Sequence, residues 1–344
     1  MLLRSTNLHE PTRVSRNIYD SLPLIKPLVI ITNAAARARN WWPSVRDQLQ
    51  SAGLEVDAYE TTKPRDATER SREALKSGVE TIAVVGGDGT LSEAAEGFFE
   101  FNPNPAEFPH PVNPNAALAI LPSGTGDDFA RGLTNGTRAP IGHWIERIVS
   151  HCRNQTTGTQ TVDVLYGRCD GYQTPFICLN ASTMGIGGET AARVAAQGEF
   201  MRKLSGEARF ALAAMAALAN WRERLTRVTV DGEVYEGTMN LAAVANALYA
   251  GGGMMLSPAA KLDDGKLDVV TASGLNRAEI LRELTRIHKG GHVTNPKVRI
   301  RQGARVTIET LPETDAMRIE ADGNVRGFTP VEFRVMPRAL RFVV

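Results

Sequence analysis

The sequence has few cysteines, no long block of like charge and no long apolar run, and each absence excludes a class of protein. Its three cysteines form no C-x-x-C pair, which argues against a disulfide framework and fits a reducing cytosol. The 39 basic and 38 acidic residues give a net charge of +1, so electrostatic attraction to nucleic acid is not expected. The most apolar helical stretch, Phe210 to Ala219, is about half of what spanning a bilayer needs. We therefore expect a cytoplasmic protein with no nucleic-acid partner and no transmembrane segment.

The first half of the chain alternates between apolar strands and amphipathic helices. Residues 1–25 carry no apolar core of signal-peptide length, and we interpret them as an N-terminal extension. The following connections are too short for anything but parallel βαβ units. The expected strands are 27–32, 54–61, 81–86 and 117–122, and the expected helices are 42–53 and 65–78. This pattern predicts an α/β domain with a parallel sheet over residues 26–157.

The second half consists mainly of short strand candidates separated by turn residues. Asp231-Gly232 is a strong two-residue hairpin signal between two of them. The pattern predicts an antiparallel β-sandwich domain over residues 158–326, interrupted by helices near 203–223 and 276–288. The 344 residues, 42% of them hydrophobic, are enough to fill two cores. The C-terminal stretch "VEFRVMPRALRFVV", residues 331–344, fits a strand of either domain.

One glycine-rich loop lies in "VVGGDGTLSEAAEGF", residues 84–98, where an apolar strand runs into a helix. Free backbone N–H groups at a helix N-terminus attract phosphate, and glycines let the phosphate approach closely. Asp88 repels phosphate directly, so its presence makes sense if a divalent cation or a hydroxyl proton stands between them. The loop therefore suggests phosphoryl transfer. The alternative is a tight turn in which Asp88 caps the helix, and it remains open.

A second such loop lies in "LPSGTGDDFARGL", residues 121–133, which combines glycines with two carboxylates and Arg131. It also follows a strand and opens a helix. Because the carboxyl ends of parallel strands meet at one edge of a sheet, both loops are expected to face one ligand. Neither is a Walker A loop, and "GTGDDF" lacks the third glycine of the dinucleotide fingerprint.

Five separated motifs resemble the diacylglycerol kinase catalytic-domain family, which includes bacterial lipid kinases and sphingosine and ceramide kinases. They are the two loops together with "NASTMGIGGE", "GGGMMLSPAAKLDDGKLDVV" and "IEADGN", in the family's order and spacing over about residues 26 to 344. The resemblance implies an α/β domain like that of phosphofructokinase and NAD kinase, then a β-sandwich, with ATP and Mg²⁺ in the cleft. It also implies that the chain end, residues 327–344, completes the first domain.

The resemblance implies a set of nucleotide-binding residues. They match the two loops and the residues that follow the first two strands: Asn33, Thr62, Gly86, Gly87, Asp88, Gly89, Thr90, Glu93, Gly124, Thr125, Gly126, Asp127, Asp128 and Arg131. Asp264 matches a position that holds a structural Mg²⁺ in bacterial members of the family. An ordinary Asp-Gly turn explains Asp264 without metal and stays open.

The chain departs from the family pattern at several of these positions. Asp127 replaces the usual asparagine and adds negative charge beside the phosphates, which calls for tighter metal compensation. Asn324 stands where the family's Asp-Gly-Glu motif has its glutamate, and an amide cannot accept a proton as a carboxylate can. Either Asp88 or Asp322 is then the catalytic base, or catalysis is weak. Positioning and charge neutralisation dominate phosphoryl transfer, so one missing acid need not abolish activity.

The resulting hypothesis is a peripheral membrane enzyme that transfers the γ-phosphoryl group of ATP to the primary hydroxyl of a neutral lipid, diacylglycerol first. The alternatives are a sphingoid-base or ceramide kinase, a NAD kinase-like enzyme, and a non-catalytic nucleotide- or lipid-binding homologue. The helix within residues 204–221 is either packed core, an acyl-chain slot or a bilayer contact. The pattern leaves a homodimer undecided. On these grounds Asp88→Asn should barely change stability while lowering lipid phosphorylation.

Overall fold

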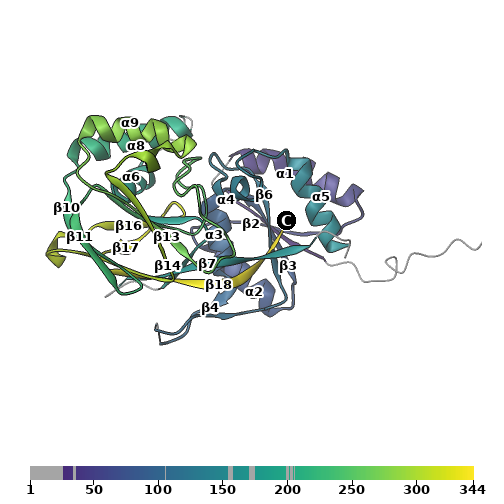
Figure 1. The fold of residues 1–344 in the computed structure, drawn as a ribbon. Coiled ribbons are helices and arrows are strands. Elements are labelled where there is room, and N and C mark those ends of the chain that lie inside the picture. Colours follow the sequence, from purple (N-terminus) through teal and green to yellow (C-terminus); the bar gives the residue numbers. More distant parts are fainter. Residues whose placement is uncertain are drawn as a thin grey trace, which may run out of the picture.

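The computed structural model describes residues 26–33, 36–104, 106–153, 158–169, 175–198, 201, 204 and 206–344. These residues form two lobes connected by long strands (Figure 1). The expected N-terminal extension, residues 1–25, lies outside the described residues.

The first lobe is built on four parallel strands in the order β6-β3-β1-β2. Helix α1 packs with α5 on one face, and α2 packs with α3 on the other (Figure 1). The strands are β1 (Leu28–Ile31), β2 (Asp57–Glu60), β3 (Thr81–Gly86) and β6 (Ala117–Pro122). The helices are α1 (Ala36–Ser51), α2 (Asp66–Lys76), α3 (Asp88–Glu96), α4 (Asp128–Leu133) and α5 (Ile141–Cys152). The predicted α/β fold is confirmed.

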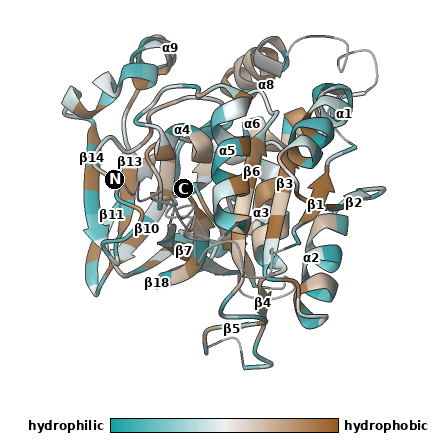
Figure 2. Cartoon of the chain, turned by 90° about the vertical axis from the view of Figure 1, so that its right-hand side faces the viewer, coloured by the Kyte–Doolittle hydropathy of each residue, from teal (hydrophilic) through white to brown (hydrophobic). Residues whose placement is uncertain are grey.

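The central strands β1 and β3 are buried along their whole length, which explains their continuous apolar sequence. Figure 2 shows them as a hydrophobic layer between more hydrophilic helices. Between α3 and β6, the described residues form the two-residue strands β4 (Phe99–Glu100) and β5 (His110–Pro111), which pair with each other.

The second lobe is the expected β-sandwich. One of its layers is a six-stranded antiparallel sheet in the order β14-β13-β12-β9-β16-β17. The other contains β11, β10, β15 and β18, with β7 and β8 beside them. Their bounds are β7 (Thr159–Cys169), β8 (Phe176–Cys178), β9 (Ala181–Gly185), β10 (Arg224–Val230), β11 (Glu233–Met239), β12 (Leu241–Ala245), β13 (Leu267–Ala272), β14 (Val298–Gly303), β15 (Arg305–Thr310), β16 (Arg318–Ala321), β17 (Asn324–Phe328) and β18 (Val331–Val343).

Strand β18 belongs to both lobes. Its first residues pair antiparallel with β15, and Arg341 and Phe342 pair parallel with Ala117 and Leu118 of β6. Strand β7 pairs with β18 in both halves, so the sheet is continuous from one lobe to the other (Figure 1). The tail that sequence patterns left unassigned therefore joins the two domains.

Three helices cover the outer face of the six-stranded sheet: α6 (Ile186–Ala195), α8 (Gly206–Asn220) and α9 (Arg277–Arg286) (Figure 1). Helices α8 and α9 were expected, but α6 was not, because two glycines in its first turn hide the helical signal. The predicted hairpin at Asp231-Gly232 joins β10 to β11. Among the described residues, none of the helices combines the length and apolarity needed to cross a bilayer.

Candidate active site

The two glycine-rich loops meet at their glycines. Strands β3 and β6 are neighbours, and Gly86 pairs with Pro122 at their carboxyl ends. A Cβ atom added to Gly124 would lie 2.7 Å from the Cα atom of Gly87, so a side chain there would collide with the first loop. The loops therefore face one site, as the parallel arrangement predicts.

Asp88 is the first residue of α3, yet its carboxylate caps the other helix, α4. The backbone N–H groups of Asp128 and Phe129 donate to its two oxygens, each at 2.9 Å. Asn180 of the sandwich domain donates from Nδ2 to Asp88 Oδ1 at 3.3 Å. The carboxylate is thus fixed between the two loops and the second domain. Its bonds differ from the expected cap of its own helix, because the N-cap residue of α3 is Gly87, which makes no side-chain cap.

Asp322 fixes the segment that carries Asn180. This buried residue lies in the turn between β16 and β17, and Leu179, Asn180 and Ala181 donate their backbone N–H groups to its carboxylate at 2.7, 3.0 and 3.4 Å. Burial raises the pKa of Asp322 although these bonds oppose the rise. Asp322 therefore organises the backbone around Asn180. The sequence motif contained Asn180, but only the fold shows its contact with Asp88.

Asp127 has left-handed backbone geometry, with φ of 50°, and its Oδ1 atom accepts the N–H of Gly124 at 2.8 Å. An asparagine would make the same bond. Burial, followed by the negative charge of Asp88, raises the pKa of Asp127 to about 6. No hydrogen bond within the described part of the chain reaches its second oxygen, Oδ2.

Asp128 reaches across the cleft. Its carboxylate accepts the N–H groups of Gly252 at 2.8 Å and Gly253 at 2.6 Å, which belong to the sandwich domain. Both glycines have φ above 90°, a conformation that side chains disfavour. Burial, followed by the charge of Asp88, raises the pKa of Asp128 to about 7. The second loop is therefore tied directly to the "GGG" segment.

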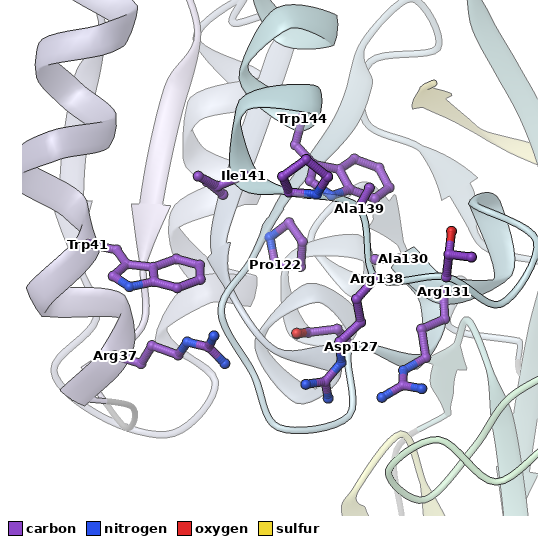
Figure 3. Close-up of a pocket in the computed structure, with 12 residues that line it drawn as sticks. Arg37, Trp41, Pro122, Asp127, Ala130, Arg131, Arg138, Ala139, Ile141 and Trp144 are labelled. Carbon is purple, nitrogen blue, oxygen red and sulfur yellow. The ribbon is translucent and has the colours of Figure 1, made fainter. Parts of the chain in front are cut away.

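Arginines surround the outer side of the second loop. Arg131 donates from Nε to the carbonyl of Gly126 at 2.8 Å, and Arg138 donates to the carbonyl of Thr125. With Arg37 they line a pocket of about 190 Å³ that also contains Asp127, Trp41 and Trp144 (Figure 3). The guanidinium of Arg37 lies 4.3 Å from the centre of the Trp41 ring. Within the described ranges, none of these three arginines forms an ion pair with a carboxylate.

The other predicted nucleotide contacts lie at the same sheet edge with partners of their own. The side-chain oxygen Oδ1 of Asn33 accepts a hydrogen bond from the hydroxyl of Thr61, and the Thr62 hydroxyl donates to Asp66. Glu93 accepts the N–H of Arg65, and burial raises its pKa. The side chain of Thr90 packs against Gly86.

One departure from the family pattern, Asn324, lies at the β16–β17 turn. The amide of Asn324 would lie 3.9 Å from a Cβ atom added to Gly89, so this side chain borders the first loop. Glu320 is buried on β16, just before this turn, and accepts bonds from the hydroxyl of Thr183 and the N–H of Gly323. Burial raises the pKa of Glu320 to about 7. The sequence interpretation assigned Glu320 no role.

Asp264 lies in an exposed turn that contacts Asp163 of β7 through the next residue, Gly265. Its Oδ1 atom accepts the N–H of Lys266 at 3.1 Å, while buried Asp163 holds the next residue of the turn through the N–H of Gly265. In the described ranges no cluster of three histidine, cysteine or acidic side chains is arranged to hold a metal ion. The turn is thus formed by hydrogen bonds, and its metal site remains a prediction.

Two family models match the chain in succession. The diacylglycerol kinase catalytic domain matches residues 27–163, and the YegS C-terminal NAD kinase beta sandwich-like domain matches residues 184–344. A diacylglycerol kinase from Staphylococcus carnosus is 27% identical over 291 residues, which cover 85% of both chains. A probable lipid kinase YegS-like protein from Xanthomonas axonopodis pv. citri is 28% identical over 294 residues, which cover 85% of this chain and 88% of the relative.

Solved structures share the fold. The crystal structure of a putative diacylglycerol kinase from Bacillus anthracis superposes with a TM-score of 0.68 at 22% identity, covering 97% of this chain and 98% of the other. Both domains and their order are common to the two proteins. The two family models, which together match residues 27–163 and 184–344, place the chain in the diacylglycerol kinase catalytic-domain family of lipid kinases.

Proposed function

We propose that this protein transfers the γ-phosphoryl group of ATP to the primary hydroxyl of diacylglycerol, acting from the cytoplasm at a membrane surface. The observation that carries the proposal is the position of Asp88 between the two glycine loops and Asn180 of the sandwich domain. This arrangement puts one carboxylate where a nucleotide from the first domain and an acceptor from the second would meet. The names of the relatives support diacylglycerol as the acceptor.

The nucleotide phosphates have a defined set of donors. Asp88 already occupies the N-terminus of α4, so the phosphates are left with the free N–H groups at the start of α3. Arg37, Arg131 and Arg138 add positive charge without competing carboxylate partners in the described chain. Trp41 and the Arg37 guanidinium offer planar surfaces, which suit a purine base.

The acidic residues of the loops suit a divalent cation. Asp88 raises the pKa of both Asp127 and Asp128, so these carboxylates repel one another. Oδ2 of Asp127 is the oxygen with no hydrogen bond in the described chain, and we assign it as the carboxylate ligand. Mg²⁺ bound there would offset this repulsion and neutralise charge on the transferred group.

Asp88 is the candidate base for the acceptor hydroxyl. Its position is fixed by three donors, so it needs little rearrangement to accept a proton. Asp322 is buried and turns both oxygens toward backbone N–H groups, which makes it a positioning residue in this proposal. Of the two candidate bases that the sequence left open, we therefore propose Asp88 as the base and Asp322 as the positioning residue.

The test is incubation of the purified protein with radiolabelled ATP, Mg²⁺ and dispersed lipids, followed by chromatography. We expect labelled phosphatidic acid when diacylglycerol is supplied, and label reduced by about a hundredfold or more with the Asp88→Asn variant. Label on a sphingoid base or ceramide but not on diacylglycerol would replace the proposed acceptor. Label on NAD alone would identify a NAD kinase-like enzyme, and ATP binding without any labelled product would identify a non-catalytic homologue.

A further inference from the structure

Helix α8 presents an apolar face to solvent. Its inner side chains, among them Ala213, Ala217 and Leu218, are buried against the sandwich. On the outer side, Leu212 is 50% exposed and Met215 is 53% exposed, although both are large hydrophobic residues. Between residues 210 and 219 the helix contains no charged or polar side chain. A helix on the surface of a globular domain ordinarily turns charged residues outward, so this face lacks its usual solvent-adapted composition.

Helix α9 places cations beside this face. Arg277 at its start donates to the carbonyl of Ala219 at the end of α8, at 2.9 Å. The two helices lie at the same end of the molecule in both views, with α9 mostly hydrophilic and α8 pale brown (Figures 1 and 2). Leu281 of α9 is 39% exposed and extends the apolar surface.

The charge beside the face is positive. Residues 277–289 contain four arginine or lysine residues and two glutamates. Both glutamates are already paired, Glu279 with Lys297 and Glu283 with Arg286. The side chain of Arg282 also pairs with Glu283 but is 61% exposed, and Lys289 is exposed as well. An apolar strip bordered by exposed cations complements a bilayer with anionic headgroups.

The face is connected to the candidate active site through α6. Helix α8 packs on α6, and hydrogen bonds between Arg209 and Gln197 join the two segments. Helix α6 directly follows β9, and the residue before β9 is Asn180, which contacts Asp88. The five residues of β9 span about 17 Å, so the start of α6, on which α8 packs, lies roughly one strand length from the site.

We propose that the outer face of α8, with the cations of α9, docks the protein on an anionic lipid bilayer. Leu212 and Met215 enter the boundary between headgroups and acyl chains, and the cations of α9 contact the headgroups. This inference rests on the proposed lipid-kinase function, because a lipid acceptor is what places a bilayer beside the protein.

Cosedimentation with vesicles tests the apolar contact. The vesicles contain phosphatidylcholine alone or equal parts of phosphatidylcholine and phosphatidylglycerol. The double variant Leu212→Asp/Met215→Asp should bind the mixed vesicles about tenfold or more weakly than the wild type, because two apolar side chains no longer enter the bilayer. Val234→Asp is the matched control, since Val234 is 56% exposed on β11. An equal loss in this control would overturn the proposal.

Charge and activity provide independent readouts. Lys289→Glu should weaken binding to the mixed vesicles more than the control Lys266→Glu does. Lys266 is exposed and directly precedes β13, whereas α9 follows the other end of that strand. Added salt should reduce the difference between the two variants. Phosphorylation of a water-soluble short-chain diacylglycerol should be unchanged in the α8 variant, while that of vesicle-borne diacylglycerol falls.

The two proposals fail in distinguishable ways. Vesicle binding that depends on Leu212 and Met215, without phosphorylation of any diacylglycerol, would keep the docking surface and remove the proposed function. Phosphorylation of diacylglycerol, together with vesicle binding that does not depend on Leu212 and Met215, would keep the proposed function and remove the docking surface. Light scattering that shows a dimer abolished by the α8 variant would overturn docking on lipid and identify a second copy as the occupant.

Discussion

The carboxylate of Asp128 accepts a 2.6 Å hydrogen bond from the backbone N–H of Gly253, which joins the second loop of the α/β domain to the sandwich domain. Asp128 also accepts the N–H of Gly252, so one side chain satisfies two backbone donors across the cleft. The position of the second loop therefore depends on the position of the Gly252–Gly253 segment of the sandwich domain.

We expect Asp128→Ala to lower both stability and lipid affinity. It leaves two backbone donors unsatisfied, which costs on the order of 1–3 kcal/mol for each donor that stays buried. Asp128→Asn keeps one acceptor and should lose less. Urea unfolding and the KM for diacylglycerol measure the two effects. An Ala variant with wild-type KM would show that this link does not position the acceptor side of the site.

Asp88→Asn should reduce phosphorylation of diacylglycerol by about a hundredfold or more, the scale for loss of a general base or metal-organising group. The structure changes the expectation that stability would barely move. Both Asp88 oxygens accept backbone N–H groups of α4, and an amide turns an NH₂ group toward one of those donors. We therefore expect a loss of about 1–2 kcal/mol in the free energy of unfolding. Near-normal kinase activity in a destabilised variant would reduce Asp88 to a capping residue.

Asp127→Asn should flatten the dependence of stability on pH. The folded protein holds a proton on Asp127 up to a pKa of about 6, whereas its ordinary value is 3.8. The folded state thus binds more protons than the unfolded state between these values, so stability is lost as pH rises through this window. Relative to the wild type, the variant should gain stability on the order of 2–3 kcal/mol across it. Urea unfolding at several pH values in chelator measures this, and parallel curves would contradict it.

Asn324→Glu should leave activity unchanged or raise it, because it returns a carboxylate to a side chain that borders Gly89. Asp322→Asn should instead act through structure, since three backbone N–H groups donate to this carboxylate. We expect a lower melting temperature together with lower kcat. A loss of kcat in Asp322→Asn with unchanged melting would return the base role to Asp322.

Asp264→Ala should lower the melting temperature more in Mg²⁺ than in chelator if the turn holds a structural ion, as the family resemblance implies. The carboxylate is exposed and bonds only to the N–H of Lys266 among the described residues, so it has room for a cation. Differential scanning calorimetry in both buffers decides the matter. Equal shifts would leave Asp264 as a turn residue.

The tertiary structure decided which residues meet. Apolar runs and glycine–aspartate turns depend on residues that are neighbours in sequence. The sequence therefore predicted the α/β half, the hairpin at Asp231-Gly232 and the two glycine-rich loops. The α6 helix was not, because its opening glycines carry no helical periodicity. Strand β18 was ambiguous for another reason: it pairs with β15 in one domain and β6 in the other, and no local pattern encodes two partners.

The amino-acid sequence by itself determined that Asp88 stands among glycines at a strand-to-helix junction, and that a second such loop follows the neighbouring strand. Only the tertiary structure decided what Asp88 does there, since its partners lie 40, 41 and 92 residues away along the chain. Contacts between residues so far apart in sequence depend on the register between paired strands, such as β3 and β6, and on how the two domains pack. They therefore appear only when the whole chain is folded.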